Sequence, residues 1–577
     1  MTFRLNDTAK HRMRVAALIL AVLFAGAAAT WWIVLRADRE MRASLQLETR
    51  MVAQGVNVER IAALSGTDAD LTNPAYLQLK EQLAATRSNY PLCRFVYLIG
   101  RKPDGTLFFF MDSEPPDSKD CSPPGQVYGE ASEGFSRVFA TGAEVVEGPV
   151  PDRWGNWVSA LVPIYGPATL PDKTGGKILA VFGMDIDARD WIRALVLSGL
   201  PPFLLAIALA AILLAGSALL ERRSWGAGRP PRSFRKLGVA LVAATGIILT
   251  LFAAWMAHDR ETHNREEAFR RLAASRTAAI AETLRNLRDT ELEGLAHFCE
   301  TNPTATTEEF LRYTAYLTKN PAIQAWVWAP VVAAADKSRF EEDARTAGRK
   351  DFQIWEKDGQ RRHVPASGRD FYYPAFHAAP QAWNVGAAGF DNGSEPRRRA
   401  ALEEAARTGL ATATVPVTLV QEEGAPNGML MYRPVFSAEN PGRLLGFVVA
   451  VVRMSTLLKG EDSAPSLPVR LFLLRKDAAP ELLASAGDAG RSPGAEYSVT
   501  RSIFAFGKVF AVSIYSGREF MVLRHHPGPA GLEALAIGVL LTSALALLAG
   551  VLLRRREELL RLVAEMTKNQ LLSLIHI

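Results

Sequence analysis

The sequence lacks the short motifs that mark the common classes of enzyme. It contains no glycine-rich loop of the kind that holds phosphate, no zinc-protease histidine pair, and no kinase or cyclase signature. We therefore expect no catalytic residue, no metal site and no cofactor in this chain. The adjacent histidines His525 and His526 border an apolar segment, where solvation at a membrane interface is favoured over metal binding.

Cysteine is scarce, with 3 residues in a chain of 577. The spacing of Cys93, Cys121 and Cys299 matches no metal or redox motif. An oxidising compartment would permit a bridge between Cys93 and Cys121. A disulfide needs Cα atoms about 4.4 to 6.8 Å apart, which the sequence does not fix, so a bridge and two free thiols both remain open.

Surplus positive charge is small and local. The net charge is +6, from 66 Lys and Arg residues against 60 Asp and Glu. The surplus lies beside apolar segments rather than on a folded basic face. The composition therefore gives no argument for a nucleic-acid partner.

Four long apolar segments are the main feature of the chain. They carry no internal charge and span residues 15–35, 194–220, 237–257 and 534–553. Each has about the 20 apolar residues that are needed to cross a bilayer. We expect four transmembrane helices in contact with lipid.

The first apolar segment has an alternative interpretation as a cleaved signal peptide. A basic region precedes it, and it contains small residues at Gly26–Ala29. However, it is longer than an ordinary signal core, and it ends in Trp31 and Trp32, which suit a membrane interface. A retained membrane anchor is favoured.

Basic residues predict the orientation. Lys and Arg cluster within residues 4–14, 222–236 and 554–556, and such clusters stay on the cytoplasmic side. The two large blocks then lie on the outer face, which we expect to be the periplasm, with the chain in a bacterial inner membrane. Between the apolar segments, the predicted order is a cytoplasmic N-terminus at 1–14, an outer domain at 36–193, a cytoplasmic connector at 221–236, a second outer domain at 258–533, and a cytoplasmic helix at 554–577.

The first outer block mixes helix and strand patterns. Residues 37–63 are helix formers with apolar side chains three and four apart, which predicts a stalk helix. Two β-rich runs, 95–99 and 107–111, flank the turn sequence Pro103-Asp104-Gly105-Thr106, which predicts a hairpin. The other predicted elements are a helix at 127–141 and strands at 157–165 and 177–185. This α+β order resembles the single Cache or extracytoplasmic PAS-like domains of bacterial receptors.

Two features of this block have more than one interpretation. Asp185 and Asp187 alternate as in some calcium sites, but the turn glycine and distant glutamate of an EF-hand are missing. A strand end that caps the next helix is favoured, although the Cache resemblance implies that Asp185 could face a ligand pocket. Trp154 and Trp157 are either pocket wall or core, and core is favoured because aromatic residues dominate small cores.

The second outer block also begins with a predicted stalk, at residues 258–300. Its apolar face consists of Leu272, Ala279, Leu284, Leu287, Leu292 and Leu295. Then follow an aromatic strand at 323–332, a helix near 339–342, a strand at 352–356 and a helix at 395–407. Short motifs accompany these elements: Tyr372-Tyr373-Pro374, Gly389-Phe390-Asp391, Thr414-Val415-Pro416, Gln421-Glu422 and Tyr432-Arg433-Pro434.

This ordered series resembles the CHASE domain, the extracytoplasmic ligand-binding module of cytokinin receptors and of many bacterial sensors. The resemblance covers residues 280–455. It implies a long stalk helix and two PAS-like lobes, with the ligand in the membrane-distal lobe. Residues 468–517, with β-rich runs at 469–474 and 509–515, would supply the membrane-proximal lobe.

The resemblance also bears on the ligand. Thr414 corresponds to a threonine that the plant receptors need, but Arg398 stands where they have the acid that binds adenine. A guanidinium cannot accept a hydrogen bond from a purine amino group, which argues against a cytokinin. If Arg398 faces the pocket, an acidic small molecule would suit it. The alternative, slightly favoured by the sequence, is that Arg397–Arg399 form the solvated face of their helix.

Aromatic residues of the same series are further candidates for ligand contact. Most aromatic residues at strand spacing belong to a core, so we expect about half of them to touch a ligand. The predicted ligand-binding residues are Trp326, Trp328, Tyr372, Tyr373, Phe390, Arg398, Thr414 and Tyr432.

The last part of the chain resembles a signalling helix. Residues 554–566 follow the fourth apolar segment and place Leu559, Leu562 and Met566 at three-four spacing, which predicts the seam of a parallel homodimer. The final six residues, 572–577, are what a common sequencing adapter encodes, so we expect that an output module has been lost from the end.

Together these features predict the sensory and membrane half of a receptor. We expect its output to be a histidine kinase, with a GGDEF diguanylate cyclase as the alternative. From another class, the chain could be a non-signalling solute-binding component of a transport or adhesion assembly. The signalling helix argues against that alternative.

Overall fold

The structure is a computed structural model that divides into two compact units. It describes residues 7–90, 92–166, 176–224, 233–349, 351–360, 362–381, 385–420, 428–440, 442–458, 467–475, 478–487, 497–517, 520 and 530–575. The helical unit comprises Met1–Ala43, Arg189–Ala268 and His525–Ile577, and the sheet-bearing unit comprises Ser44–Ala188 and Phe269–Arg524. The pair His525 and His526 lies outside the described residues.

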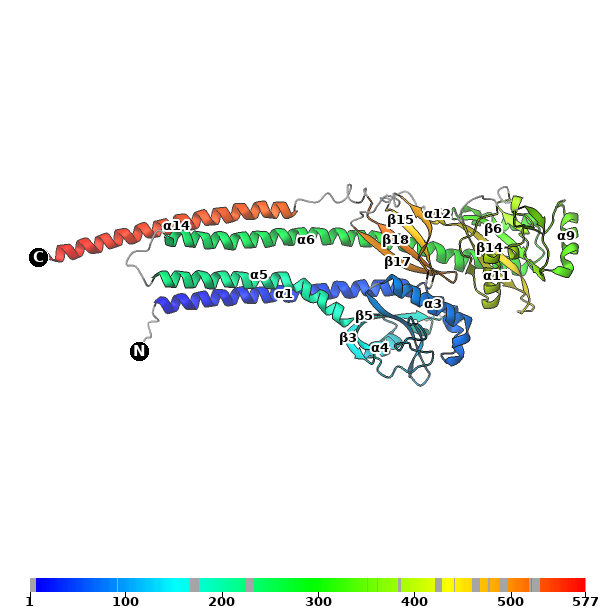
Figure 1. Ribbon diagram of the computed structural model, residues 1–577, viewed down its shortest axis with the longest axis horizontal. Coiled ribbons are helices and arrows are strands. Elements are labelled where there is room, and N and C mark those ends of the chain that lie inside the picture. Colours follow the sequence, from blue (N-terminus) through cyan, green and yellow to red (C-terminus); the bar gives the residue numbers. More distant parts are fainter. Residues whose placement is uncertain are drawn as a thin grey trace. The chain divides into compact units, whose positions relative to one another are not determined.

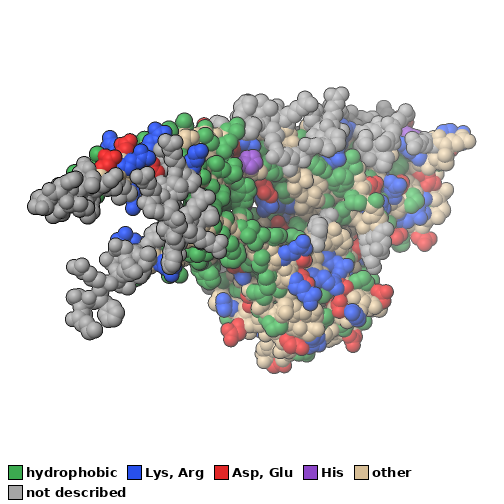
Figure 2. Space-filling view, turned by 60° about the vertical axis from the view of Figure 1, so that its left-hand side comes forward, with side chains coloured by type: hydrophobic (Ala, Val, Ile, Leu, Met, Phe, Trp, Pro, Cys, Tyr) green, Lys and Arg blue, Asp and Glu red, His purple; other side chains and the backbone are tan. Residues whose placement is uncertain are grey.

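Each of the four apolar segments is part of a long helix. The helices are α1 (Asp7–Ala53), α5 (Ala188–Ser224), α6 (Ser233–Asn286) and α14 (Ala530–Ile575) (Figure 1). All four are long and apolar enough to cross a membrane, and hydrophobic side chains form broad patches in the space-filling view (Figure 2). The predicted fold class, α+β with four membrane-spanning helices, is confirmed.

Small residues let these helices pack closely in pairs. A side chain at Gly26 of α1 would collide with Ala206 of α5, and one at Gly246 of α6 would collide with Thr542 of α14. The hydroxyl oxygens of Thr250 and Thr542 lie 3.3 Å apart. Small residues and threonine hydroxyls are the usual means of helix association in lipid, where burial of apolar surface gives no driving force.

The first outer domain is built on one antiparallel sheet in the order β2-β1-β5-β4-β3. The strands are β1 (Cys93–Arg101), β2 (Leu107–Asp112), β3 (Val145–Asp152), β4 (Gly155–Tyr165) and β5 (Ile178–Asp187). The predicted hairpin is confirmed, since Arg101 pairs with Leu107. Gly105 takes a φ of +91° in its turn, a conformation that favours glycine.

Helices in this domain differ from those predicted. The stalk is divided, because α1 ends at Ala53 and a separate α2 covers Val58–Ala62. The predicted helix at 127–141 is wrong in its first part: α4 covers only Glu133–Thr141, because Val127 forms a β-bridge with Phe108. The sequence did not predict α3 (Pro74–Asn89), which packs on β1 and β2. Much of the predicted loop at 166–176 lies outside the described residues.

The second outer domain has two sheets. The distal sheet has the order β11-β6-β14-β13-β12, from strands β6 (Ile323–Pro330), β11 (His377–Ala379), β12 (Thr412–Ala413), β13 (Gly428–Phe436) and β14 (Leu444–Arg453). The proximal sheet has the order β16-β15-β18-β17, from strands β15 (Val469–Leu474), β16 (Glu481–Ala486), β17 (Ser498–Ala505) and β18 (Lys508–Tyr515). Strands β15 and β18 match the predicted runs, whereas β16 and β17 were not predicted.

Helices and two short strand pairs surround the distal sheet. The helices are α7 (Glu293–Thr301), α8 (Thr307–Thr314), α9 (Lys337–Thr346), α11 (Pro396–Thr408) and α12 (Met454–Leu457), with one-turn elements η5 (Val385–Ala387) and η6 (Asn392–Ser394). The strand pairs are β7 (Val332–Ala333) with β10 (Phe371–Tyr372), and β8 (Trp355–Lys357) with β9 (His363–Pro365). The strand predicted at 352–356 corresponds to β8, which is shorter and begins later in the sequence, at Trp355.

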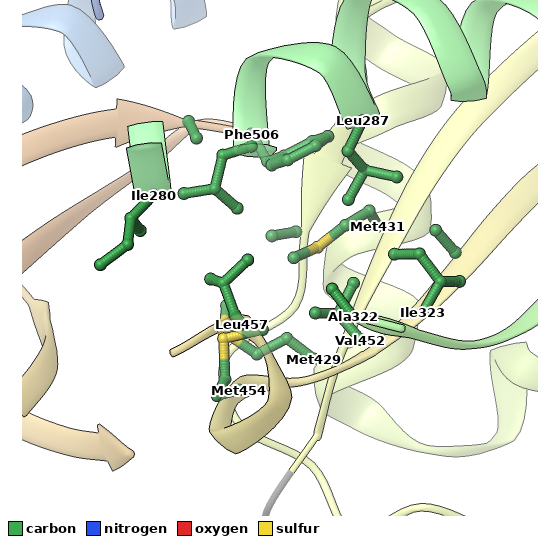
Figure 3. Packing of buried hydrophobic residues seen from close by; sticks show 14 of the residues in the cluster. Ile280, Leu287, Ala322, Ile323, Met429, Met431, Val452, Met454, Leu457 and Phe506 are labelled. Atoms are coloured by element: carbon green, nitrogen blue, oxygen red, sulfur yellow. The ribbon is translucent and has the colours of Figure 1, made fainter. Parts of the chain in front are cut away.

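The stalk runs from α6 through a π-helical turn, η2 (Leu287–Leu292), into α7. Its predicted apolar face is largely confirmed, since Leu284, Leu287, Leu292 and Leu295 are at most 2% exposed, but Ala279 is exposed. In Figure 3, Ile280 and Leu287 lie in the same cluster as Met431 of β13 and Ile323 of β6. The stalk therefore packs on one face of the distal sheet.

The two faces of the distal sheet pack on different partners. On β6, Trp326 and Trp328 belong to the stalk cluster, whereas Ala325 and Val327 belong to a second cluster with Leu402 of α11. This division follows from the alternation of side chains along a strand. The sheet is thus a single layer between the stalk and α11.

All three cysteines are free thiols. Cys93 is buried in β1, where its Sγ donates to the carbonyl oxygen of Phe95 at 3.1 Å. Burial raises the pKa of the Cys93 thiol well above its ordinary value and that of Cys299 to about 12. These thiols stay protonated and pack as small hydrophobic side chains.

Candidate ligand-binding site

A cavity lies on the α11 face of the distal sheet. Its walls come from β6, β13 and β14, from the segment around β11, and from η6 and α11. It contains about 450 Å³ of space not filled by atoms, part of which is open to solvent. Space remains along one wall because Ala375, Ala378 and Ala387 have small side chains.

Arg398 brings a positive charge to the wall of this cavity. It lies in the first turn of α11, where its backbone N–H donates to the carboxylate of Glu395 at 2.8 Å. Its side chain is buried, and the residue is only 4% exposed. The solvated helix face that the sequence slightly favoured therefore does not describe Arg398, although Arg397 is exposed.

The guanidinium of Arg398 has few and weak partners. Nη1 lies 3.4 Å from Asn392 Oδ1, Nη2 donates to the Thr418 carbonyl oxygen at 3.2 Å, and Nε has no partner among the described residues. The guanidinium carbon lies 4.9 Å from the centre of the Phe390 ring. Burial lowers the pKa of the guanidinium, which reflects the cost of removing a cation from water.

Asn392 links the arginine to the sheet. Its Oδ1 accepts a hydrogen bond from the Tyr432 hydroxyl at 3.0 Å, and its Nδ2 donates to the Tyr373 carbonyl oxygen at 3.0 Å. Tyr432 is fully buried on β13, and burial raises the pKa of its hydroxyl well above the ordinary value. The amide is thus fixed in orientation, with its oxygen toward Arg398.

Asp391 holds the turn that carries Asn392. Its carboxylate accepts from the backbone N–H groups of Tyr373 at 2.7 Å and Gly393 at 3.0 Å, and from Arg369 Nε at 3.0 Å. The residue is fully buried. Because Asp391 is bound by Arg369, it does not neutralise Arg398, and none of the described carboxylates forms an ion pair with Arg398.

Comparison with protein families identifies the domain that holds this cavity. The model of the CHASE domain matches residues 303–483, which include both the distal sheet and the start of the proximal sheet. The chain contains a CHASE domain. Since CHASE domains are sensor modules and four helices here can span a membrane, the protein is a membrane sensory receptor.

Comparisons with other proteins add little to this assignment. No curated protein matches the chain. Among solved structures, the extracellular domain of a protein described as a histidine kinase is similar at 11% identity, covering 46% of this chain and 99% of its own, with a TM-score of 0.22. A methyl-accepting chemotaxis protein is similar at 13% identity, covering 46% and 98%, with a TM-score of 0.21. At these TM-scores, the similarities support no argument about function.

The structure brings three of the predicted ligand-binding residues together in the CHASE domain. Phe390 and Arg398 line the cavity, and Tyr432 adjoins them through its hydrogen bond to Asn392. Tyr373 lies behind this wall, where its ring packs against Phe447.

Four other predicted residues lie away from the CHASE cavity. Trp326 and Trp328 point from β6 into the stalk cluster, on the opposite face of the sheet. Tyr372 belongs to a small separate core with Phe352. Thr414 is buried beside Leu430, whose backbone N–H donates to the Thr414 hydroxyl at 3.1 Å. The Thr414 side chain therefore binds the backbone of β13.

Several wall residues were not predicted from the sequence. Asn392 follows the Gly389-Phe390-Asp391 motif directly, and Val327, Leu430 and Val449 supply apolar surface from the strands. The sequence did contain a clue to Leu430, because side chains alternate along a strand and Leu430 therefore lies on the same face of β13 as the predicted residue Tyr432. The sequence alone gave no reason to choose this face over the other.

A second cavity lies in the first outer domain, and Asp185 lines it. It contains about 320 Å³ of space not filled by atoms, part of which is open to solvent, and is bordered by Phe109, Tyr128 and Trp154. The Asp185 carboxylate accepts from the Tyr97 hydroxyl at 2.9 Å, and burial raises its pKa to about 7. No cluster that could hold a metal ion occurs among the described residues.

Proposed function

We propose that this protein is a receptor of the bacterial inner membrane that binds a small molecule in the cavity of its CHASE domain. Both outer domains are periplasmic in this proposal. The observation that carries it is the position of the cavity: it occupies one face of the distal sheet, and the stalk helix packs on the other face. A ligand is therefore separated from the stalk by one layer of strands.

Charge distribution supports the orientation. Arg12 and Arg14 precede the first apolar segment, and Arg554–Arg556 follow the last. With an even number of crossings, both ends lie on the same side, and positive residues favour the cytoplasm. The two sensor domains are then exposed to ligands in the periplasm.

The C-terminal helix supports a signalling role. Helix α14 continues without interruption from its apolar segment through Arg554–Arg556 to Ile575. A continuous helix transmits a shift or rotation across the membrane to a module attached to it. A histidine kinase is the output that we favour, and a diguanylate cyclase would use the same helix. A solute-binding component of a transport assembly would not need it.

A thermal-shift screen of the full chain in lipid nanodiscs tests the proposal. A ligand that binds only the folded protein adds about 2.7 kcal/mol of stability at a hundredfold excess over Kd, which raises the melting temperature. We expect at least one compound of a metabolite library to do so. If no compound stabilises the protein, the receptor proposal is wrong.

A cavity-filling variant shows whether binding occurs in this cavity. Ala378→Leu extends a side chain into the cavity and should remove the ligand-dependent shift. Ala333→Leu is the matched control, because Ala333 is half-buried in the same lobe but does not line the cavity. Loss of the shift in the control as well as in Ala378→Leu would contradict the assignment of this cavity.

A further inference from the structure

We propose that the ligand of the CHASE cavity is a monocarboxylate, and that its carboxylate pairs with the guanidinium of Arg398. This inference rests on the proposed function and names the class of ligand. It is carried by a buried arginine that lines a cavity and whose Nε–H has no partner among the described residues.

A buried cation is costly unless it is paired with an anion. Arg398 is 4% exposed, and its two neutral acceptors lie at 3.4 and 3.2 Å. Charge-assisted hydrogen bonds to a carboxylate are shorter, at about 2.7 to 2.9 Å, and about twice as strong as neutral ones. The arginine therefore has binding capacity that its neighbours among the described residues do not use.

The position of Arg398 in its helix adds to this cost. It lies in the first turn of α11, where the helix dipole is positive and disfavours a cation. Glu395 caps this helix end, because its carboxylate accepts from the backbone N–H of Arg398 at 2.8 Å, and the guanidinium is left for another anion. A residue that violates two local rules at a cavity wall is typical of a functional site.

The neighbouring arginines show the ordinary alternative. Arg397 Nη1 donates to the Pro416 carbonyl oxygen at 2.6 Å, and Arg399 Nε donates to the Gly393 carbonyl oxygen at 2.7 Å. Both are more exposed than Arg398. They hold loops at the surface and remain partly solvated, so water screens their charges, whereas Arg398 is buried.

The rest of the wall limits the ligand to one negative charge. Val327, Leu430 and Val449 are apolar, and Asn392 is neutral, with its oxygen already an acceptor. A monocarboxylate balances the single charge of Arg398. A phosphate monoester carries about two negative charges and would leave one of them buried. The apolar strands suit a hydrocarbon or aromatic body attached to the carboxylate.

Binding of benzoate, with benzamide as its neutral isostere, tests the inference on the full chain in nanodiscs. A panel of other aliphatic and aromatic acids, each with its amide, is measured in the same way. We expect acids to raise the melting temperature and amides not to. In Arg398→Met, the Kd of a bound acid should rise by about 10- to 100-fold. Arg397→Met and Arg399→Met are the matched controls and should bind it as the parent does.

The unliganded protein provides a second readout. If Arg398 serves only to hold Asn392 and Thr418, Arg398→Met should lower the melting temperature without ligand. If it is a cation without an anionic partner, Arg398→Met should melt at the same temperature or higher, because burial of an unpaired charge is costly and the apolar side chain removes that cost.

Each other outcome overturns a defined part of the argument. Three results would each disprove the proposal that the ligand is a monocarboxylate. Acids and amides could stabilise the protein equally, Arg398→Met could bind acids as well as the parent does, or phenyl phosphate could bind more tightly than benzoate. If neutral library compounds bind the cavity and no acid does, the proposal that the ligand is a monocarboxylate is wrong, but the receptor proposal stands. If no compound binds at all, the receptor proposal fails too.

Two glutamates of this chain must be tested as internal partners of Arg398. Glu422 and Glu423 lie outside the described residues. In the double variant Glu422→Gln/Glu423→Gln, we expect the same acid binding as in the parent. If acids bind only this variant, an internal carboxylate occupies Arg398, and the inference is wrong.

Discussion

Asp185 makes the stability of the first outer domain depend on pH. Its pKa is about 7 because it is buried, against an ordinary value of 3.8. Between these values the folded protein keeps a proton that the unfolded chain has lost. The stabilising contribution is therefore complete below about pH 4 and is lost as the pH rises through about 7.

We predict that Asp185→Asn makes the protein less sensitive to pH. Asparagine can still accept the hydrogen bond from Tyr97, but it has no proton to lose. Between about pH 5 and pH 7, the parent should lose up to about 1.4 kcal/mol per pH unit more than the variant. Melting temperatures measured across this range check the difference. Asp117→Asn, at an exposed position of the same domain, should behave like the parent, and an unchanged slope in Asp185→Asn would contradict the prediction.

Asp391 is expected to be the main polar support of the cavity wall. Asp391→Asn removes a buried charge from Arg369 and turns one of three acceptor contacts into a donor clash. We predict a loss of about 1 to 3 kcal/mol in the free energy of unfolding, because the Arg369 Nε–H then faces an amide N–H instead of a carboxylate oxygen. Thermal unfolding measures it. Asp343→Asn, in an exposed pair with Arg339, should change little; equal effects at both positions would refute this role.

At the scale of elements, the two faces of the distal sheet have different roles, one in forming the cavity and the other in packing on the stalk. Residues of β6, β13 and β14 that face α11 form the cavity, and their neighbours in sequence face the stalk. Strand alternation therefore predicts that a change at one position affects packing on the stalk, while a change at the next affects ligand binding.

We predict that Trp328→Phe mainly lowers stability and that Val449→Leu mainly weakens ligand binding. Trp328 packs in the stalk cluster, so Trp328→Phe should lower the free energy of unfolding by about 1 to 3 kcal/mol without altering the Kd of a ligand. Val449 lines the cavity, so Val449→Leu should weaken binding more than it lowers stability. Thermal melts and ligand titrations of both variants measure these effects. A larger change in Kd for Trp328→Phe than for Val449→Leu would show that the tryptophan touches the ligand after all.

At the scale of the whole molecule, the orientation in the membrane is open to direct test. We predict that reporter fusions at Asp120 and Val420 score as periplasmic and that a fusion at Gly228 scores as cytoplasmic. The reason is that the basic residues flanking the apolar segments favour the cytoplasmic side. Alkaline phosphatase and fluorescent-protein activities distinguish the two sides. A cytoplasmic signal from either outer domain would exclude periplasmic sensing.

We propose that the whole molecule also forms a parallel dimer. Leu559, Leu562 and Met566 form an apolar stripe on α14 and are 56% to 63% exposed. In a parallel dimer these side chains would meet at the seam, so Leu562→Cys should give a dimer with a short bismaleimide cross-linker in membranes. Glu557→Cys, on the opposite face of the helix, should not. Equal cross-linking at both positions would indicate random collision instead of a defined seam.

Local signals in the sequence determined a large part of this protein. Apolar length alone identified the four long helices, because crossing a bilayer requires a run that is hard to mistake. The turn at Gly105 and its β-rich flanks identified the first hairpin. Elements that depend on distant partners were missed: β16 reads Glu-Leu-Leu-Ala-Ser-Ala, a helix-forming sequence that becomes a strand by pairing with β15, and β3 contains Gly148 and Pro149, which resemble a loop.

The sequence by itself also indicated the CHASE domain, because the short motifs of that domain occur in order along the chain, and the CHASE model matches residues 303–483. Only the tertiary structure decided which residues line the cavity. Strand β6 is apolar on both faces, so alternation could not tell whether Trp326 and Trp328 or Val327 face the ligand. Likewise, three consecutive arginines look alike in sequence, and the rotation of α11 over the sheet buries Arg398 and leaves Arg397 exposed, because a helix advances about 100° per residue.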